Sequence, residues 1–147
     1  MSVTVHEIHH DSAQQPEFTL VQALAKGDRD LQAAEAATEL GVSRVIPWQA
    51  ERSIVRVHAD RAAKLMAKWD STLAAAAKQS RRARWPERGD WVDTAGLARL
   101  IAAEPETLWL VLHESASTRW STPDVTRWGD RSRIAVIVGP EGGIGDG

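Results

Sequence analysis

The sequence predicts an α/β fold in which a parallel β-sheet carries helices on both faces. Apolar stretches of strand length alternate along the chain with stretches of helical periodicity. The strand-like stretches, such as residues 134–138, are apolar throughout rather than at alternate positions, which is typical of strands buried on both faces. The 147 residues are enough for one domain with a substantial core and too few to expect two.

The predicted elements follow a polar N-terminal segment. Residues 1–17 lack periodicity and are expected to form a linker or a disordered tail, so that the folded domain covers residues 18–147. Strands are predicted at residues 18–25, 42–48, 54–57, 107–112 and 134–138. Helices are predicted from Asp28 or Asp30 to Leu40, over residues 61–80 and over residues 94–103.

Capping residues and apolar stripes support the predicted helices. Asp28 or Asp30 is placed to cap the first helix, and Gly41 supplies a left-handed stop at its end. The longest helix has one apolar stripe at helical spacing, formed by Ala62, Leu65, Met66, Trp69, Leu73 and Ala76. The last helix has a shorter apolar face, formed by Leu97, Leu100 and Ile101.

The composition excludes several classes of protein. The absence of Cys excludes disulfides and thiolate metal sites and suits a reducing cytosol. A formal charge of −2 argues against a generally basic nucleic-acid binder, so such a role needs a local patch. The sequence has no signal-peptide pattern and no stretch approaching the ~18 apolar residues of a membrane span. We therefore predict a cytoplasmic protein without membrane contact. His6, His9 and His10 lack a supporting ligand framework, so no metal is predicted.

A glycine-dense segment, Gly139-Pro140-Glu141-Gly142-Gly143, follows the apolar stretch at residues 134–138. Glycines at the carboxyl end of a buried strand let backbone amides approach a small molecule, and open α/β sheets bind ligands at that edge. The segment matches neither a phosphate-binding loop, which needs a following Lys-Ser/Thr, nor a dinucleotide fingerprint. A tight turn that merely leaves the strand is the alternative interpretation.

A second polar segment, His113-Glu114-Ser115, follows the neighbouring predicted strand. Adjacent parallel strands end at the same edge of a sheet, so the two segments are expected to form one crevice. His113 is a candidate for orienting a ligand or moving a proton. The alternative is a histidine that forms only local hydrogen bonds at the end of its strand.

A basic segment surrounds Trp85. Its cations are Lys78, Arg81, Arg82, Arg84 and Arg88. Clustered arginines supply phosphate contacts and an indole can stack on a base, so the segment is a candidate RNA-binding surface. The alternative is a solvated helix C-terminus, where cations suit the helix dipole.

Six segments, in this order, resemble those of one protein family. They are residues 20–28 (LVQALAKGD), 37–42 (ATELGV), 46–53 (IPWQAERS), 77–87 (AKQSRRARWPE), 112–114 (LHE) and 138–143 (VGPEGG). Together they are similar to the bacterial 16S ribosomal RNA uridine-N3 methyltransferases (RsmE type) of the SPOUT superfamily. The resemblance covers the chain from about Phe18 onward.

The resemblance implies an S-adenosylmethionine-dependent homodimer that methylates N3 of a uridine in 16S ribosomal RNA of the small subunit, without a metal. It implies a C-terminal trefoil knot that holds the cofactor. The implied cofactor-binding residues are Leu112, His113, Glu114, Gly139, Pro140, Glu141, Gly142 and Gly143. The implied RNA-binding residues are Lys78, Gln79, Ser80, Arg81, Arg82 and Arg84.

Two departures from the family pattern lead us to expect an incomplete SPOUT domain over residues 18–147. The family opens with a small RNA-binding β-barrel, which has no counterpart here. It also continues past the glycine loop with a segment that completes the knot and carries a candidate catalytic Arg, so no catalytic residue is assigned in this chain. Two alternatives to an active enzyme follow: a non-catalytic RNA-binding remnant that uses residues 78–88, and an unstable fragment.

Overall fold

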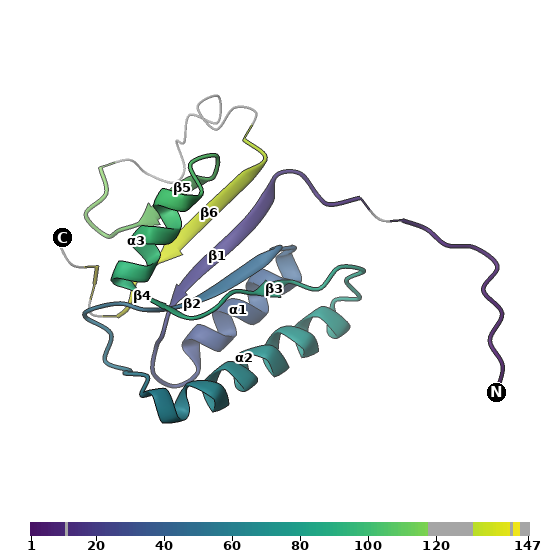
Figure 1. Cartoon of the computed structure of the whole chain (residues 1–147), viewed down its shortest axis with the longest axis horizontal. Helices are drawn as coiled ribbons and strands as arrows, with labels where there is room; N and C mark the ends of the chain where they lie inside the picture. Colours follow the sequence, from purple (N-terminus) through teal and green to yellow (C-terminus); the bar gives the residue numbers. More distant parts are fainter. Residues whose placement is uncertain (11, 118–130, 142, 145–147) are drawn as a thin grey trace.

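The computed structural model of the chain describes residues 1–10, 12–117, 131–141 and 143–144. Within these residues a six-stranded sheet lies between helices on both of its faces (Figure 1). Residues 1–10 and 12–16 contain neither helix nor strand and lead away from the sheet. The predicted α/β class with a parallel, helix-flanked sheet is confirmed.

The sheet is parallel throughout. Its strands are β1 (Glu17–Ala23), β2 (Arg44–Gln49), β3 (Glu87–Arg88), β4 (Val92–Asp93), β5 (Leu108–Leu112) and β6 (Arg133–Val138). The strand order is β3-β2-β1-β6-β5. Strand β3 pairs with the first residues of β2, and the short strand β4 pairs with the last residues of β2. Because every pair is parallel, the carboxyl ends of β1, β2, β5 and β6 lie at one edge of the sheet and their amino ends at the other.

The helices divide between the two faces. Helices α1 (Arg29–Leu40) and α2 (Ala59–Gln79) cover one face, and α3 (Thr94–Ala103) covers the other (Figure 1). Gly41 ends α1 in the predicted left-handed conformation, with φ of 105°, and its N–H bonds the carbonyls of Ala37 and Thr38. Asp28 takes the N-cap position, but its side chain makes no capping hydrogen bond and instead pairs with Lys68 at 2.7 Å.

The predicted strand at residues 54–57 is wrong. These residues belong to the connection between β2 and α2, and Ile54 is 60% exposed. The backbone N–H of Val57 bonds the side-chain Oε1 of Gln49 at 2.6 Å, so a side chain takes the place of a neighbouring strand. Ile54, Val55 and Val57 have high strand propensity, but propensity alone does not supply a pairing partner. Strands β3 and β4 were not predicted because two residues are too short for any periodicity.

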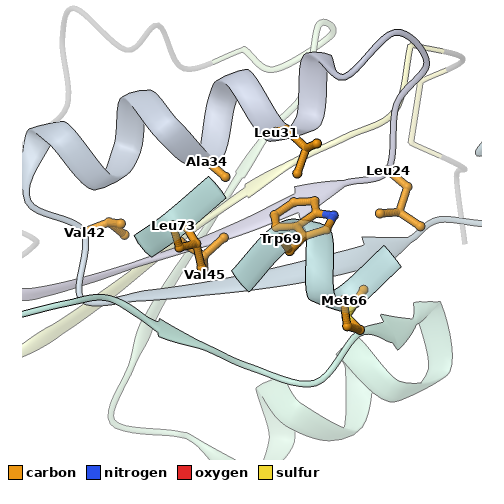
Figure 2. Close-up of a cluster of buried hydrophobic side chains, with 8 residues drawn as sticks. All are labelled: Leu24, Leu31, Ala34, Val42, Val45, Met66, Trp69 and Leu73. Carbon is orange, nitrogen blue, oxygen red and sulfur yellow. The ribbon is translucent and has the colours of Figure 1, made fainter. Parts of the chain in front are cut away.

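One hydrophobic core lies between the sheet and helices α1 and α2. Trp69 of α2 is fully buried at its centre, between Leu31 of α1 and Val45 of β2 (Figure 2). The other buried members of this core are Leu24, Ala34, Val42, Met66 and Leu73. The predicted apolar stripe of the long helix therefore forms the contact surface of α2.

A second core lies on the other face, beneath α3. Val21, Ile46 and Ile137 come from the three central strands and pack against Leu97 of α3. Ile144, which follows the glycine segment, is partly buried against the same core. The adjacent positions Val45 and Ile46 point to opposite cores, as the alternation of side chains along a strand requires.

The C-terminal end of α1 is anchored by an arginine that lies 40 residues or more further along the chain. Arg82 Nη1 donates to the carbonyls of Val42 at 2.6 Å and Thr38 at 3.3 Å, and Nη2 donates to Gly41 at 3.4 Å. These carbonyls belong to the last turn of α1 and the residues that follow it. One guanidinium thus satisfies acceptors that the end of the helix leaves open.

Replacing the central tryptophan should destabilise the fold strongly. We expect Trp69→Ala to lower the free energy of unfolding by about 3–5 kcal/mol, because a buried ring is lost and a cavity remains. Urea denaturation followed by circular dichroism measures this change. The matched variant Trp85→Ala removes an indole that is 53% exposed and should cost less than about 1 kcal/mol. Equal losses for the two variants would contradict the assigned core.

Removing the Arg82 anchor should also destabilise the fold. We expect Arg82→Ala to cost about 1.5–3 kcal/mol, because charged hydrogen bonds to part-buried carbonyls are lost. Arg82→Lys keeps the charge but not the planar fork, so it should recover only part of the loss. Thermal unfolding of the three proteins tests this order. An Arg82→Ala variant as stable as the parent would show that the anchor is dispensable.

Candidate functional site

A cleft of about 190 Å³ lies at the carboxyl edge of the sheet, where β5 and β6 end side by side. Leu112 pairs in register with Val138, so the segments that follow both strands leave the sheet at the same level. The cleft is lined by Leu112, His113, Glu114, Val138, Gly139, Pro140, Glu141, Gly143 and Ile144. The expected crevice between the two segments is therefore present. Of the residues predicted for it, Gly142 lies outside the described residues.

The glycine segment folds back on itself beside the cleft. The N–H of Gly143 bonds the carbonyl of Pro140 at 2.9 Å, and Gly143 has a φ of 78°. A Cβ atom on Gly139 would lie 2.5 Å from Cγ1 of Ile144, so any larger residue there would displace Ile144 from its place against the second core. The two glycines are needed for different reasons: a left-handed backbone at Gly143 and a close contact at Gly139.

His113 has a defined tautomer in its neutral form. Its Nδ1 accepts the backbone N–H of Ser115 at 3.1 Å and lies 2.7 Å from Ser115 Oγ. An Nδ1 that accepts an amide hydrogen carries no proton, so the neutral ring has its proton on Nε2. The local hydrogen bonds therefore fix the ring and leave Nε2–H outside them, on a residue that lines the cleft. The local hydrogen bonds of the second interpretation are therefore present, and a role of His113 toward a ligand stays a prediction.

Glu141 forms an ion pair that the sequence did not reveal. Its Oε1 lies 2.6 Å from Nη1 of Arg29, the first residue of α1. The side chains are 39% and 72% exposed, so the pair contributes less than about 1 kcal/mol. It nevertheless ties the glycine segment to the start of α1. Because 112 residues separate the partners, no local pattern could have predicted it.

Other charged groups at the carboxyl edge surround this pair. A small hollow next to the cleft is lined by Lys26, Pro140 and Glu141, together with the side chains of the connections after β1 and β2. Asp30 is buried at the start of α1, where its Oδ1 accepts the N–H of Leu31 at 2.9 Å. Burial raises the pKa of this carboxyl above its ordinary value.

The basic segment lies at the opposite edge of the sheet. It borders a groove of about 710 Å³, which we call the amino-edge groove, lined by Ser12, Ala13, Gln14, Glu17, Ser43, Ser80, Arg81, Arg82, Ala83, Arg84, Trp85 and Glu87. Glu17 begins β1, Glu87 begins β3 and Ser43 precedes β2, so the groove is at the amino ends of the strands. In Figure 1 the N-terminal segment and the end of α2 are on the right, and the arrowhead of β6 points to the left.

The predicted RNA-binding residues differ in what they contact. Arg82 points inward to the α1 carbonyls, and burial lowers its pKa. Ser80 Oγ bonds the carbonyl of Ala76 at 2.6 Å within α2. The Nζ atom of Lys78 lies 5.6 Å from the centre of the Trp85 ring, and Gln79 is exposed. Arg81 and Arg84 are exposed and line the groove.

The cation Arg88 is not part of the groove. Its Nε lies 2.5 Å from Oδ1 of Asp70 on α2, which holds β3 against that helix. The basic segment that looked uniform in the sequence therefore includes Arg82 and Arg88, whose side chains bind other parts of the fold, beside the exposed Arg81.

In the part of the chain that the structure describes, no group of three or more His, Asp or Glu side chains lies close enough to hold a metal ion. No helix among those residues is long and apolar enough to cross a membrane.

Comparison with known proteins places this geometry in a family. Residues 13–146 match the family model of an RNA methyltransferase domain. Among curated proteins, the ribosomal RNA small subunit methyltransferase E of Mycobacterium bovis is 37% identical over 131 residues, covering 88% of this chain and 49% of its own length. The protein of the same name from Bacillus subtilis is 28% identical over 130 residues, covering 85% of this chain and 50% of its own length.

Solved structures show the same fold. A ribosomal RNA small subunit methyltransferase E from Neisseria gonorrhoeae, bound to S-adenosyl methionine, matches with a TM-score of 0.74 and 28% identity, over 93% of this chain and 56% of its own. A methyltransferase from Legionella pneumophila, also in complex with that cofactor, matches with a TM-score of 0.73 and 30% identity, over 90% of this chain and 52% of its own. The chain spans about half the length of the relatives it matches. It belongs to the RNA methyltransferase domain family, as an RsmE-type member with the SPOUT-like fold.

Proposed function

We propose that this chain carries the cofactor-binding part of an S-adenosylmethionine-dependent methyltransferase that modifies N3 of a uridine in 16S ribosomal RNA. The observation that carries this proposal is the cleft between the ends of β5 and β6. The proposed cofactor contacts are Leu112, His113, Glu114, Gly139, Pro140, Glu141, Gly142 and Gly143. The matches from Neisseria gonorrhoeae and Legionella pneumophila, both described with this cofactor, support the choice of ligand.

The chemistry of the cleft suits a ligand with apolar and polar parts. Leu112 is apolar yet 43% exposed, and it lines the cleft. The Nε2–H of His113 offers a donor beside it, and the glycine backbone allows a ligand to approach closely. Small-molecule sites commonly combine an apolar wall with a few fixed polar groups.

The reaction demands mainly alignment and charge stabilisation. A bound cofactor would supply the methyl group: N3 of uridine would take it as the carbon–sulfur bond breaks, and the N3 proton would pass to water. A cation near O2 or O4 of the uracil favours the deprotonated ring. Lys26 is a cation of this chain beside the cleft. Holding the two reactants in line is a positioning task that the rigid ends of β5 and β6 suit.

The proposed partners are the small ribosomal subunit and a second copy of the protein. The curated relatives are named as small-subunit ribosomal RNA methyltransferases, which supports the RNA partner. Homodimer formation is a proposal from the family resemblance. In this chain it is supported by the outermost strand β5, where Val111 and Leu112 are exposed.

A non-catalytic RNA-binding protein is the second candidate. It is favoured by one observation, the amino-edge groove with Arg81, Arg84 and Trp85, which does not involve the cofactor cleft. The two candidates differ in one property that can be measured directly. A methyltransferase binds S-adenosylmethionine, whereas an RNA-binding remnant does not need to.

Titration of the chain with S-adenosylmethionine, followed by calorimetry, tests the first candidate. We expect saturable binding that weakens about 5- to 30-fold in Gly143→Ala, because the free loop relaxes out of the left-handed conformation and ligand binding must restore it at a cost of about 1–2 kcal/mol. Gly27→Ala is the matched control, since Gly27 also has a positive φ and a Cβ there meets no atom within 4 Å.

The two variants separate the possible outcomes. Weaker binding in Gly143→Ala alone supports the cleft as the cofactor site. Equal affinity in Gly143→Ala and the parent would place the cofactor elsewhere. Absence of binding by the folded parent would favour the RNA-binding candidate.

A further inference from the structure

We propose that the amino-edge groove binds an unpaired segment of RNA at a distance from the uridine that is methylated, with Arg81 as the main phosphate contact. This inference rests on the proposed function, because it assigns a second RNA contact to the same enzyme. The groove is distinct from the cofactor cleft in position, lining residues and charge.

The position of the groove separates it from the reaction. The groove lies at the amino ends of β1, β2 and β3, and the cleft lies at the carboxyl ends of β5 and β6. A strand rises ~3.3 Å per residue, so strands of this length place the two edges about 20 Å apart. Within one chain, a uridine in the cleft and its immediate neighbours therefore do not reach the groove. What binds in the groove is a remote part of the RNA.

Arg81 has an unusual backbone for an arginine. Its φ is 54°, in the left-handed region, directly after the C-cap of α2 at Ser80. The N–H groups of Arg81 and Arg82 bond back to the carbonyls of Lys78 and Ala77, which closes the end of the helix. Glycine is the usual residue at such a position, because it has no Cβ to strain the backbone. A strained residue at a surface groove suggests that its side chain is kept for a function.

The groove has the charge that an RNA backbone requires. Its lining includes three arginines against two glutamates. Arg82 is engaged by the carbonyls at the end of α1, whereas the guanidinium of Arg81 makes no ion pair with the residues that the structure describes. Arg81 is therefore a cation of the groove whose charge is available for a phosphate. Glu17 and Glu87 also line the groove, and a phosphate placed beside either carboxylate would be repelled.

Trp85 favours an unpaired RNA segment over a duplex. Its indole lines the groove and is 53% exposed, with Lys78 Nζ 5.6 Å from the ring centre. An exposed aromatic ring offers a stacking surface to any base that is not stacked within a helix. The lysine adds a positive charge where the adjoining phosphate would lie. A duplex keeps its bases stacked internally and gains nothing from this ring.

Fluorescence anisotropy with a labelled oligouridylate tests the proposal. We expect Arg81→Gly to raise the melting temperature, because the backbone strain is relieved, and to weaken RNA binding several-fold. The magnitude of the slope of log affinity against log salt should fall by about 0.7, as for loss of one phosphate contact to a single strand. A higher melting temperature together with weaker RNA binding indicates a lost contact, because partial unfolding would lower both the melting temperature and the affinity. Trp85→Ala should weaken binding of the oligouridylate but not of a blunt RNA duplex of equal length.

The control variant is Arg99→Ala, which removes an exposed cation from α3 on the other face of the sheet. It should leave RNA affinity unchanged. Equal affinity of the parent and Arg81→Gly, or equal losses for Arg81→Gly and Arg99→Ala, would overturn the proposal. Binding of S-adenosylmethionine is measured on the same samples. If the chain binds the cofactor but its RNA binding does not depend on Arg81, only the proposal for the groove is overturned. If the chain binds neither the cofactor nor RNA through Arg81, the proposed function is overturned as well.

Discussion

The parallel pairing of β1 with both β2 and β6 is the constraint on which the rest of the structure depends. Val21 stands between Ile46 and Ile137 in this register, and all three pack into the core beneath α3. The opposite faces of β1 and β2 supply Leu20 and Val45 to the core around α1 and α2. Because both faces are buried, a shift of one residue would exchange the two cores. The register is therefore fixed by packing, and it sets the level at which every loop leaves the sheet.

The same topology decides where the functional segments lie. A helix that joins two parallel strands must return the chain from the carboxyl edge to the amino edge, so the end of α2 and the basic segment after it are placed at the amino edge. The segments after β5 and β6 are placed at the other edge for the same reason. The separation between the cofactor cleft and the amino-edge groove is thus a consequence of the parallel sheet, independent of the residues in either site.

Cations that look alike in the sequence have different roles in the fold. Arg82 stabilises the end of α1, Arg88 joins β3 to α2 through Asp70, and Arg81 faces the groove from a left-handed backbone. Arg29, which no motif singled out, holds Glu141 of the glycine segment. The number of arginines in a segment is therefore a poor measure of its affinity for RNA, because some of them already bind carbonyls or carboxylates of the protein.

The sequence by itself determined the fold class, most strands and helices, the apolar stripe of α2 and the two segments that meet at the cleft, because each depends on local periodicity or on the order of elements. It predicted a strand at residues 54–57 that does not form, since propensity cannot show whether a partner strand is present. Only the tertiary structure decided the partners of Arg82 and Glu141 and the opposite positions of the cleft and the groove. These depend on contacts between residues far apart in the chain, which no local pattern encodes.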